Sequence, residues 1–301
     1  MKNRTTILLC CALAALLVLS GCSASAHGDG PDTSPSQSAS SSGAGSTPPD
    51  GSPAPDPGAA GSSDAAPDAS LSPQPDGSGQ AAKSSAYDFS SPVPERDPVD
   101  NSYFQDAAFI GDSRTDGFLI YSGIGCGENL TSNGLSIFKL DTKKAIAIDG
   151  ENYTIPEALG RKQYGKVYLS LGVNELGYYD DKGFYEAYCK AVDTIRACQP
   201  NAVIYIQGLI PLNESVIAST GGPSYLTNEH LLVYNDLMKQ VAREKQVAFL
   251  DLNPAFAGPD GQLPADASRD GVHLTKAYCE KWLDYLKTHT VDYDTLYPAQ
   301  S

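Results

Sequence analysis

A low-complexity tract near the N-terminus most constrains how this 301-residue chain folds. From Ser23 to Ala86, 49 of 64 residues are Ser, Gly, Pro or Ala, and Leu71 is the only large apolar side chain. Such a segment buries too little apolar surface to offset the entropy lost on ordering, so we expect a disordered tether. We place this tether at residues 22–100. The remaining chain, about 200 residues, is long enough for one domain with a sizeable core, predicted at 101–295.

Residues 1–21 have the features of a secretory signal. Lys2 and Arg4 precede an apolar run from Ile7 to Leu19, and small residues follow it. The run is shorter than the about 20 residues that a membrane-spanning helix needs. The segment Leu19-Ser20-Gly21-Cys22 resembles a bacterial lipobox, in which the cysteine receives a diacylglyceryl group. This resemblance implies an extracytoplasmic domain held to the membrane by lipid on Cys22; a plain signal peptide or a signal anchor is the alternative.

The charge balance argues against a nucleic-acid partner. The formal net charge is −15, and residues 101–301 carry 17 Lys and Arg against 25 Asp and Glu. A negative surface repels phosphate backbones and offers no basic stripe. The acidic surface disfavours an anionic substrate only mildly, because Arg114 could offset it locally. The sequence indicates no oligomeric state.

Four cysteines lie in the predicted domain, where an extracytoplasmic location would permit disulfides: Cys126, Cys189, Cys198 and Cys279. Their spacing matches no metal site, so we expect neither a metal nor a cofactor. Cys189 and Cys198 share one predicted helix, about 13 Å apart along its axis, which excludes a bridge between them. We expect reduced thiols in the core.

Short apolar runs without clean alternation predict strands covered on both faces, at residues 107–111, 166–171, 202–207 and 247–252. Helical spacing recurs between and after them, at 184–195, at 231–241 behind Thr227 and Asn228, and after Thr275. This alternation predicts a parallel α/β sandwich with right-handed crossovers. Asp149-Gly150 between two extended runs predicts a tight hairpin within 145–155, before a helix near Pro156. Gly221-Gly222-Pro223 indicates a long loop at the edge of the sheet.

Three polar sites follow predicted strands, and each has a structural alternative. Ser113, after Gly111-Asp112, is placed to be an exposed nucleophile between strand and helix, or simply part of a helix N-cap. Asn174, after Gly172, could donate its amide to an oxyanion, or could serve only as a turn residue. Asp270 and His273, three residues apart, could form a carboxylate–imidazole pair, or merely a polar loop. Their common position at strand carboxyl ends favours one shared crevice.

At these residues the sequence is similar to the SGNH, or GDSL-type, hydrolase superfamily. Ser113 in Gly-Asp-Ser matches the nucleophile, Asn174 in Gly-Val-Asn-Glu the oxyanion-hole residue, and Asp270 and His273 in Asp-Gly-Val-His the rest of the triad. Gly134 lies where the glycine block falls, with Gly123, Gly125 and Gly127 close by. The resemblance spans roughly residues 104–290. Glu175, where Asp is commoner, and Arg114, after the nucleophile, depart from the pattern.

The resemblance implies a three-layer, flavodoxin-like fold with a central parallel five-stranded sheet. It also implies a serine esterase, with an oxyanion hole formed by the N–H groups of Ser113 and Gly134 and the side chain of Asn174. With the predicted anchor, the expected substrate is a small ester or an acetylated cell-wall or extracellular glycan. An O-acyltransferase acting on a glycan and a catalytically silent, wall-tethered binding module are the alternatives.

Overall fold

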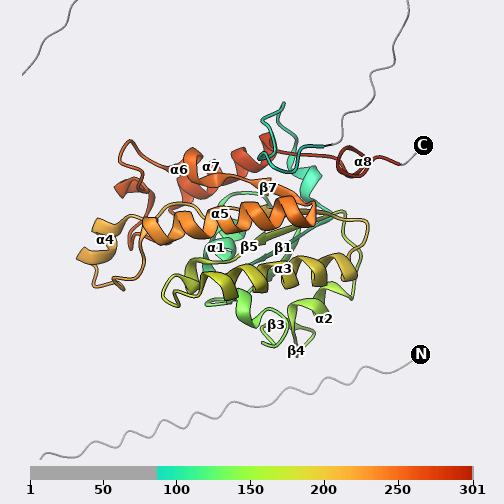
Figure 1. The fold of residues 1–301 in the computed structure, drawn as a ribbon, viewed down its shortest axis with the longest axis horizontal. Helices are drawn as coiled ribbons and strands as arrows, with labels where there is room; N and C mark the ends of the chain where they lie inside the picture. The colour runs from blue at the N-terminus through green and yellow to red at the C-terminus, as the bar shows by residue number, and fades with distance from the viewer. Residues whose placement is uncertain (1–86, 300–301) are drawn as a thin grey trace, which may run out of the picture. The chain divides into compact units, whose positions relative to one another are not determined.

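The computed structural model describes residues 87–299 (Figure 1). The predicted signal at 1–21, the lipidation site Cys22 and most of the predicted tether lie outside the described residues. Among residues 87–299, no helix is long and apolar enough to cross a bilayer.

The last part of the predicted tether, residues 87–100, packs on the domain, so the predicted boundary at residue 100 is too late. Val93 is buried, and its N–H donates to the carbonyl of Phe249 at 2.9 Å. The Phe89 ring stacks on that of Tyr297, with centroids 6.2 Å apart. Apolar side chains spaced along this Pro-rich segment therefore bury surface against the domain.

Five parallel strands form the central sheet, in the order β2-β1-β5-β6-β7. Their bounds are β1 (Ala107–Gly111), β2 (Glu128–Thr131), β5 (Lys166–Ser170), β6 (Val203–Gln207) and β7 (Ala248–Leu250). The predicted fold class is confirmed, and four strands lie within the predicted runs. The fifth, β2, was not located from the sequence, because Glu-Asn-Leu-Thr is a polar edge strand with a single buried side chain, Leu130.

Helices cover both faces of the sheet. The longer ones are α1 (Ser113–Tyr121), α3 (Asp181–Cys198), α5 (Asn228–Lys245) and α7 (Lys276–Thr288). The shorter ones are α2 (Ile155–Leu159), α4 (Glu214–Ser219), α6 (Leu252–Phe256) and α8 (Tyr293–Leu296), and the 3-10 turns are η1 (Asn101–Phe104), η2 (Ile137–Lys139), η3 (Val173–Glu175) and η4 (Ala265–Ala267). Figure 1 shows α3 and α5 side by side in front of the sheet.

Two apolar clusters, one on each face, make up the core. Ile110, Leu169 and Ile206 belong to the cluster that includes α3 and α5. Phe109, Tyr168 and Tyr205 point the other way, toward Phe118 of α1 and Trp282 of α7. Because successive side chains of a strand face opposite sides, each doubly covered strand needs an unbroken apolar run. The layers keep the sheet rigid and leave its carboxyl edge for the loops.

Two local predictions are confirmed. Strands β3 (Ile146–Ile148) and β4 (Glu151–Tyr153) pair antiparallel around Asp149 and Gly150, both of which have positive φ. The Thr227 hydroxyl caps α5 by accepting from the His230 N–H. The loop containing Gly221 carries a short helix, α4, that was not predicted.

All four cysteines of the described chain are free thiols. Cys189 and Cys198 both lie on α3, as predicted. No group of three or more His, Cys, Asp or Glu side chains within residues 87–299 could hold a metal ion.

Candidate active site

Ser113 is the first residue of α1, directly beyond the carboxyl end of β1. Asp112 is the N-cap, and its Oδ1 accepts from the Arg114 N–H at 2.9 Å. A side chain at Gly111 would overlap Thr115, with a Cβ 2.1 Å from Oγ1, so only glycine permits this sharp turn from strand to helix. The first N–H groups of a helix have no intrahelical acceptor. The turn therefore presents both the hydroxyl and the N–H of Ser113 at the sheet edge.

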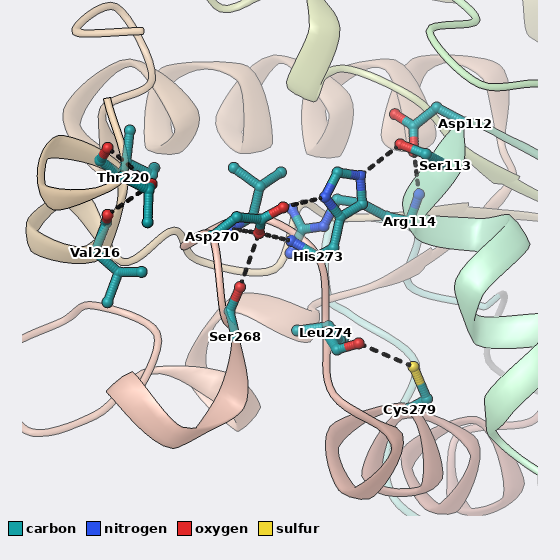
Figure 2. Close-up of polar contacts among 12 residues, drawn as sticks. Asp112, Ser113, Arg114, Val216, Thr220, Ser268, Asp270, His273, Leu274 and Cys279 are labelled. Atoms are coloured by element: carbon teal, nitrogen blue, oxygen red, sulfur yellow. Dashed lines mark hydrogen bonds and ion pairs between the residues drawn. The ribbon is translucent and has the colours of Figure 1, made fainter. Parts of the chain in front are cut away.

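A hydrogen-bonded chain links Ser113 to His273 and Asp270 (Figure 2). Ser113 Oγ lies 2.8 Å from His273 Nε2, and His273 Nδ1 lies 2.6 Å from Asp270 Oδ2. Both distances are within hydrogen-bonding range. The carboxylate at Nδ1 favours the tautomer in which Nε2 can accept the serine proton.

The loop bearing Asp270 and His273 is closed at its base and packed at its turn. Ser268 and Leu274 form an antiparallel bridge across it. Gly271 has a φ of 82°, and a Cβ there would lie 2.5 Å from the carbonyl oxygen of Asn213, beside the start of α4. Close backbone approach and positive φ both require glycine at this position. The packing fixes the pair that flanks Gly271.

Four donors converge on the Asp270 carboxylate. Oδ1 accepts from the N–H groups of Val272 and His273 at 2.9 and 2.8 Å and from the Ser268 hydroxyl at 3.1 Å. Partial burial raises the pKa of Asp270, but the hydrogen bonds from His273 and the two N–H groups outweigh it, and the pKa lies well below the usual value. Asp270 is therefore a permanent anion beside the imidazole. The side chains of His273 and Asp270 are half exposed, at 50% and 49%.

Asn174 joins the other two predicted oxyanion donors. Its Nδ2 donates to Asp112 Oδ2 and to the carbonyl of Leu135, both at 3.1 Å, and so contacts the neighbours of Ser113 and of Gly134. Gly134 is exposed, with a φ of 65° in a turn that follows β2. Within residues 87–299, no hydrogen bond engages the N–H of Ser113 or of Gly134.

The topology separates Gly134 from the other three glycines near it in sequence. Gly123, Gly125 and Gly127 precede β2 and therefore lie at the amino ends of the parallel strands. Asn101, just before β1, donates to the carbonyls of Gly123 and Ile124 at this opposite edge. Gly134 is thus the glycine among these four that shares the edge of Ser113.

Two buried carboxyl groups lie behind the site. Burial raises the pKa of Asp112, although the Arg114 N–H and guanidinium act against the rise. Burial also raises the pKa of Glu175 to about 7, against hydrogen bonds from Ser136 and from the Ile137 N–H, which lies 2.5 Å from Oε1. The Glu175 side chain, fully buried, thereby ties the loop after Asn174 to the segment after Gly134.

Arg114 is buried and does not offer its charge to a substrate, contrary to the sequence-based expectation. The residue is 6% exposed, and its Nη1 donates to the carbonyl of Ile210 at 3.0 Å. Burial lowers its pKa to about 10, opposed by the charges of Asp112 and Asp270. Figure 2 shows its side chain extending behind His273. Arg114 therefore contributes a positive charge behind the imidazole and its carboxylate.

A cleft of about 370 Å³ opens beside the imidazole. His273 and Asp270 line it together with Tyr121, Arg269 and Lys276. Its volume is within the range of small-molecule sites. Sequence reasoning missed the last three residues, although Arg269 directly precedes the predicted catalytic aspartate.

The profile of the GDSL-like lipase/acylhydrolase family matches residues 109–278, which include Ser113, Asn174, Asp270 and His273. This chain belongs to that family. Family membership indicates that the chain is a GDSL-type hydrolase with esterase activity in general. No curated protein sequence matches the chain significantly.

Solved structures that are similar to this chain are distant from it in sequence. A Streptococcus pneumonia structure described under the name platelet activating factor is 19% identical, covers 66% of this chain and 85% of its own, and has a TM-score of 0.50. A peptidoglycan O-acetylesterase is 19% identical over 55% of this chain and 46% of its own, with a TM-score of 0.41. The periplasmic domain of a lipopolysaccharide acetyltransferase from Salmonella ser. Paratyphi A is 19% identical over 61% and 82%, with a TM-score of 0.44. The first of these likenesses shows the fold alone.

Proposed function

We propose that this GDSL-family hydrolase is a serine esterase with Ser113 as nucleophile, His273 as general base and Asp270 as the group that orients and stabilises the imidazole. The observation that carries the proposal is the unbroken hydrogen-bonded chain from Ser113 Oγ through the two His273 nitrogens to Asp270 Oδ2. Nucleophile, base and orienting carboxylate within hydrogen-bonding reach are the arrangement that activates a serine hydroxyl.

In the acylation half of the reaction, Ser113 Oγ attacks the ester carbonyl while its proton passes to His273 Nε2. The carbonyl oxygen becomes an anion, which the N–H groups of Ser113 and Gly134 and the Asn174 amide are placed to bind. To bind the oxyanion, Asn174 must share with it an amide N–H that in this structure donates to Asp112 or to the carbonyl of Leu135. Protonated His273 gives its proton to the departing alcohol oxygen, and the acyl group stays on Ser113 as an ester.

Deacylation repeats these steps with water as the nucleophile. His273 takes a proton from water, the resulting hydroxide attacks the acyl-serine carbonyl, and the Ser113 oxygen leaves and regains a proton from His273. The free acid is released. Asp270, held as an anion by its donors, stabilises the imidazolium in both halves.

We infer that the acyl group is small and that the alcohol is a cell-wall or extracellular glycan. The half-exposed triad and a cleft of about 370 Å³ support a short acyl group on a bulky alcohol rather than a long fatty chain. A glycan O-acyltransferase is the second candidate; a transferase needs a glycan acceptor to release the acyl group, whereas a hydrolase does not. Acetate release measured with and without glycan separates the two.

We further propose that the domain is extracytoplasmic and anchored to the membrane through lipid on Cys22. The lipobox-like segment and the Ser/Gly/Pro/Ala-rich tract after it support this arrangement. Metabolic labelling with a fatty-acid precursor should mark the wild-type protein and leave Cys22→Ala unlabelled. Equal labelling of both proteins would contradict the anchor.

The esterase proposal is tested by Ser113→Ala with p-nitrophenyl acetate as substrate. Hydrolysis should fall to background while circular dichroism and the melting temperature stay at wild-type values, because the one hydrogen bond that the Ser113 hydroxyl makes within residues 87–299 is to His273 Nε2. Turnover like that of the wild type would overturn the proposal. A catalytically silent binding module would instead show no hydrolysis in either protein.

A further inference from the structure

The cleft beside His273 combines an aromatic wall with two cations. Tyr121, the last residue of α1, is 51% exposed there. Arg269 and Lys276 lie on either side of His273 in the sequence, and both line the cleft. The Ser268–Leu274 bridge brings Arg269, one residue inside it, toward His273 across the loop. Lys276 follows as the first residue of α7.

His273 lines this cleft, and it is also the residue that contacts the leaving alcohol in the proposed reaction. If the proposed function holds, His273 Nε2 must protonate the leaving oxygen, so that oxygen lies within hydrogen-bonding distance of the ring. The rest of the alcohol then extends from the imidazole into the space that the imidazole lines. The cleft is therefore positioned to receive the alcohol portion.

Arg269 is a cation without a counter-charge. It is exposed, and within residues 87–299 it makes no ion pair and no side-chain hydrogen bond. Lys276 pairs with Glu280 at 3.6 Å, but both side chains are at least half exposed, so the pair is weak and a ligand can compete for the lysine. The acidic residue of the cleft, Asp270, already accepts hydrogen bonds from four donors.

We propose that this cleft binds the alcohol portion of the substrate and that Arg269 and Lys276 select alcohols carrying an anionic group, a carboxylate or a phosphate. The inference rests on the proposed esterase function and narrows its substrate class to acidic alcohols, such as acidic sugars. In a domain whose net charge is negative, two cations at the leaving-group side favour an anion that the rest of the surface repels.

The test compares three acetate esters that differ in the group para to the ester: 4-acetoxybenzoate, 4-acetoxyphenyl phosphate and neutral 4-acetoxybenzamide. The wild type should have a higher kcat/KM for one or both anionic esters than for the neutral benzamide. Comparison of the two anionic esters shows whether a carboxylate or a phosphate is preferred. Arg269→Gln and Lys276→Gln should each lower the preference for the anionic esters over the benzamide about tenfold, through the KM of the anionic esters. Arg269→Lys should keep most of the preference.

Two matched controls remove equivalent surface charges elsewhere. Lys182→Gln breaks the exposed i,i+4 pair with Glu186 on α3, which corresponds to the pair of Lys276 and Glu280 on α7. Arg243→Gln removes an exposed arginine of α5. Both variants should keep the wild-type preference.

A preference that is absent in the wild type, or unchanged in Arg269→Gln and Lys276→Gln, would overturn the inference and leave the esterase proposal standing if the benzamide is hydrolysed. Failure to hydrolyse all three esters would overturn the esterase proposal, and this inference with it.

Discussion

The Asn174 amide donates to the Asp112 carboxylate at 3.1 Å, so the predicted oxyanion donor holds the residue that precedes the predicted nucleophile. The same nitrogen donates to Leu135, the neighbour of Gly134. One side chain therefore joins the loops after β1, β2 and β5. We infer that Asn174 has two effects: it fixes the three loops, and it is placed to stabilise the oxyanion.

Asn174→Ala should lower kcat for p-nitrophenyl acetate about 10²- to 10³-fold, the usual effect of losing one oxyanion-hole donor. Asn101→Ala is the matched control, because Asn101 also donates to two backbone carbonyls but at the opposite edge of the sheet. It should reduce the melting temperature and leave kcat nearly unchanged. Equal losses of kcat in the two variants would mean that Asn174 acts only through the fold.

Asp270→Asn should lower kcat about 10³- to 10⁴-fold with little change in KM, because an amide cannot stabilise the imidazolium and favours the wrong tautomer. Ser268→Ala removes one of the four donors to Asp270 and leaves the carboxylate in place, so it should cost less than tenfold. Steady-state kinetics on p-nitrophenyl acetate measure both. An Asp270→Asn enzyme within tenfold of the wild type would exclude the assigned role.

Gly271→Ala should destabilise the fold by about 3 kcal/mol and lower the melting temperature by about 10 °C, because the new Cβ meets backbone at a positive φ. Gly221→Ala offers a matched control: its φ is also positive, at 74°, but a Cβ there meets nothing within 4 Å. It should cost only about 1 kcal/mol. Thermal unfolding of both variants measures the difference, and equal shifts would show that the packing against Asn213 carries no energy.

Glu175 should make stability fall as the pH rises. Its folded pKa of about 7 exceeds the ordinary value of 4.5, so the folded state binds the proton more tightly. The contribution of Glu175 to the free energy of unfolding is fully present below pH 4.5 and is lost by about pH 7. The free energy lost over this range is at most about 3 kcal/mol. Glu175→Gln should flatten the melting temperature over this range, whereas Glu186→Gln, an exposed carboxyl on α3, should not. Identical pH profiles for wild type and Glu175→Gln would contradict this prediction.

Local patterns predicted the elements that carry the site. The runs ending at Gly111 and Leu171 are apolar enough to be read as buried strands, and helical periodicity identified α3, α5 and α7. Asp270 and His273 are three residues apart, so one loop brings them together whatever the rest of the chain does. Ser113 and Asn174 could be placed at the same edge because parallel strands end there together.

Features that depend on distant contacts could not be predicted in this way. The strand β2 is polar and is recognisable only through its pairing with β1. From the sequence alone, residues 87–100 are assigned to the tether. Their packing is visible only in the folded chain, where the Val93 N–H donates to the carbonyl of Phe249. The burial of Arg114 depends on the carbonyl of Ile210, 96 residues away. The reach of Glu175 to Ile137 likewise exists only in the folded chain.

Covalent labelling with an active-site fluorophosphonate tests the central claim most directly, because the reagent reacts preferentially with a serine whose proton a neighbouring base can remove. Digestion and mass spectrometry of the labelled wild type should place a single adduct on Ser113. The adduct should be absent in Ser113→Ala and strongly reduced when His273 is replaced by Ala. An unlabelled wild-type protein, or an adduct on another residue, would contradict the account.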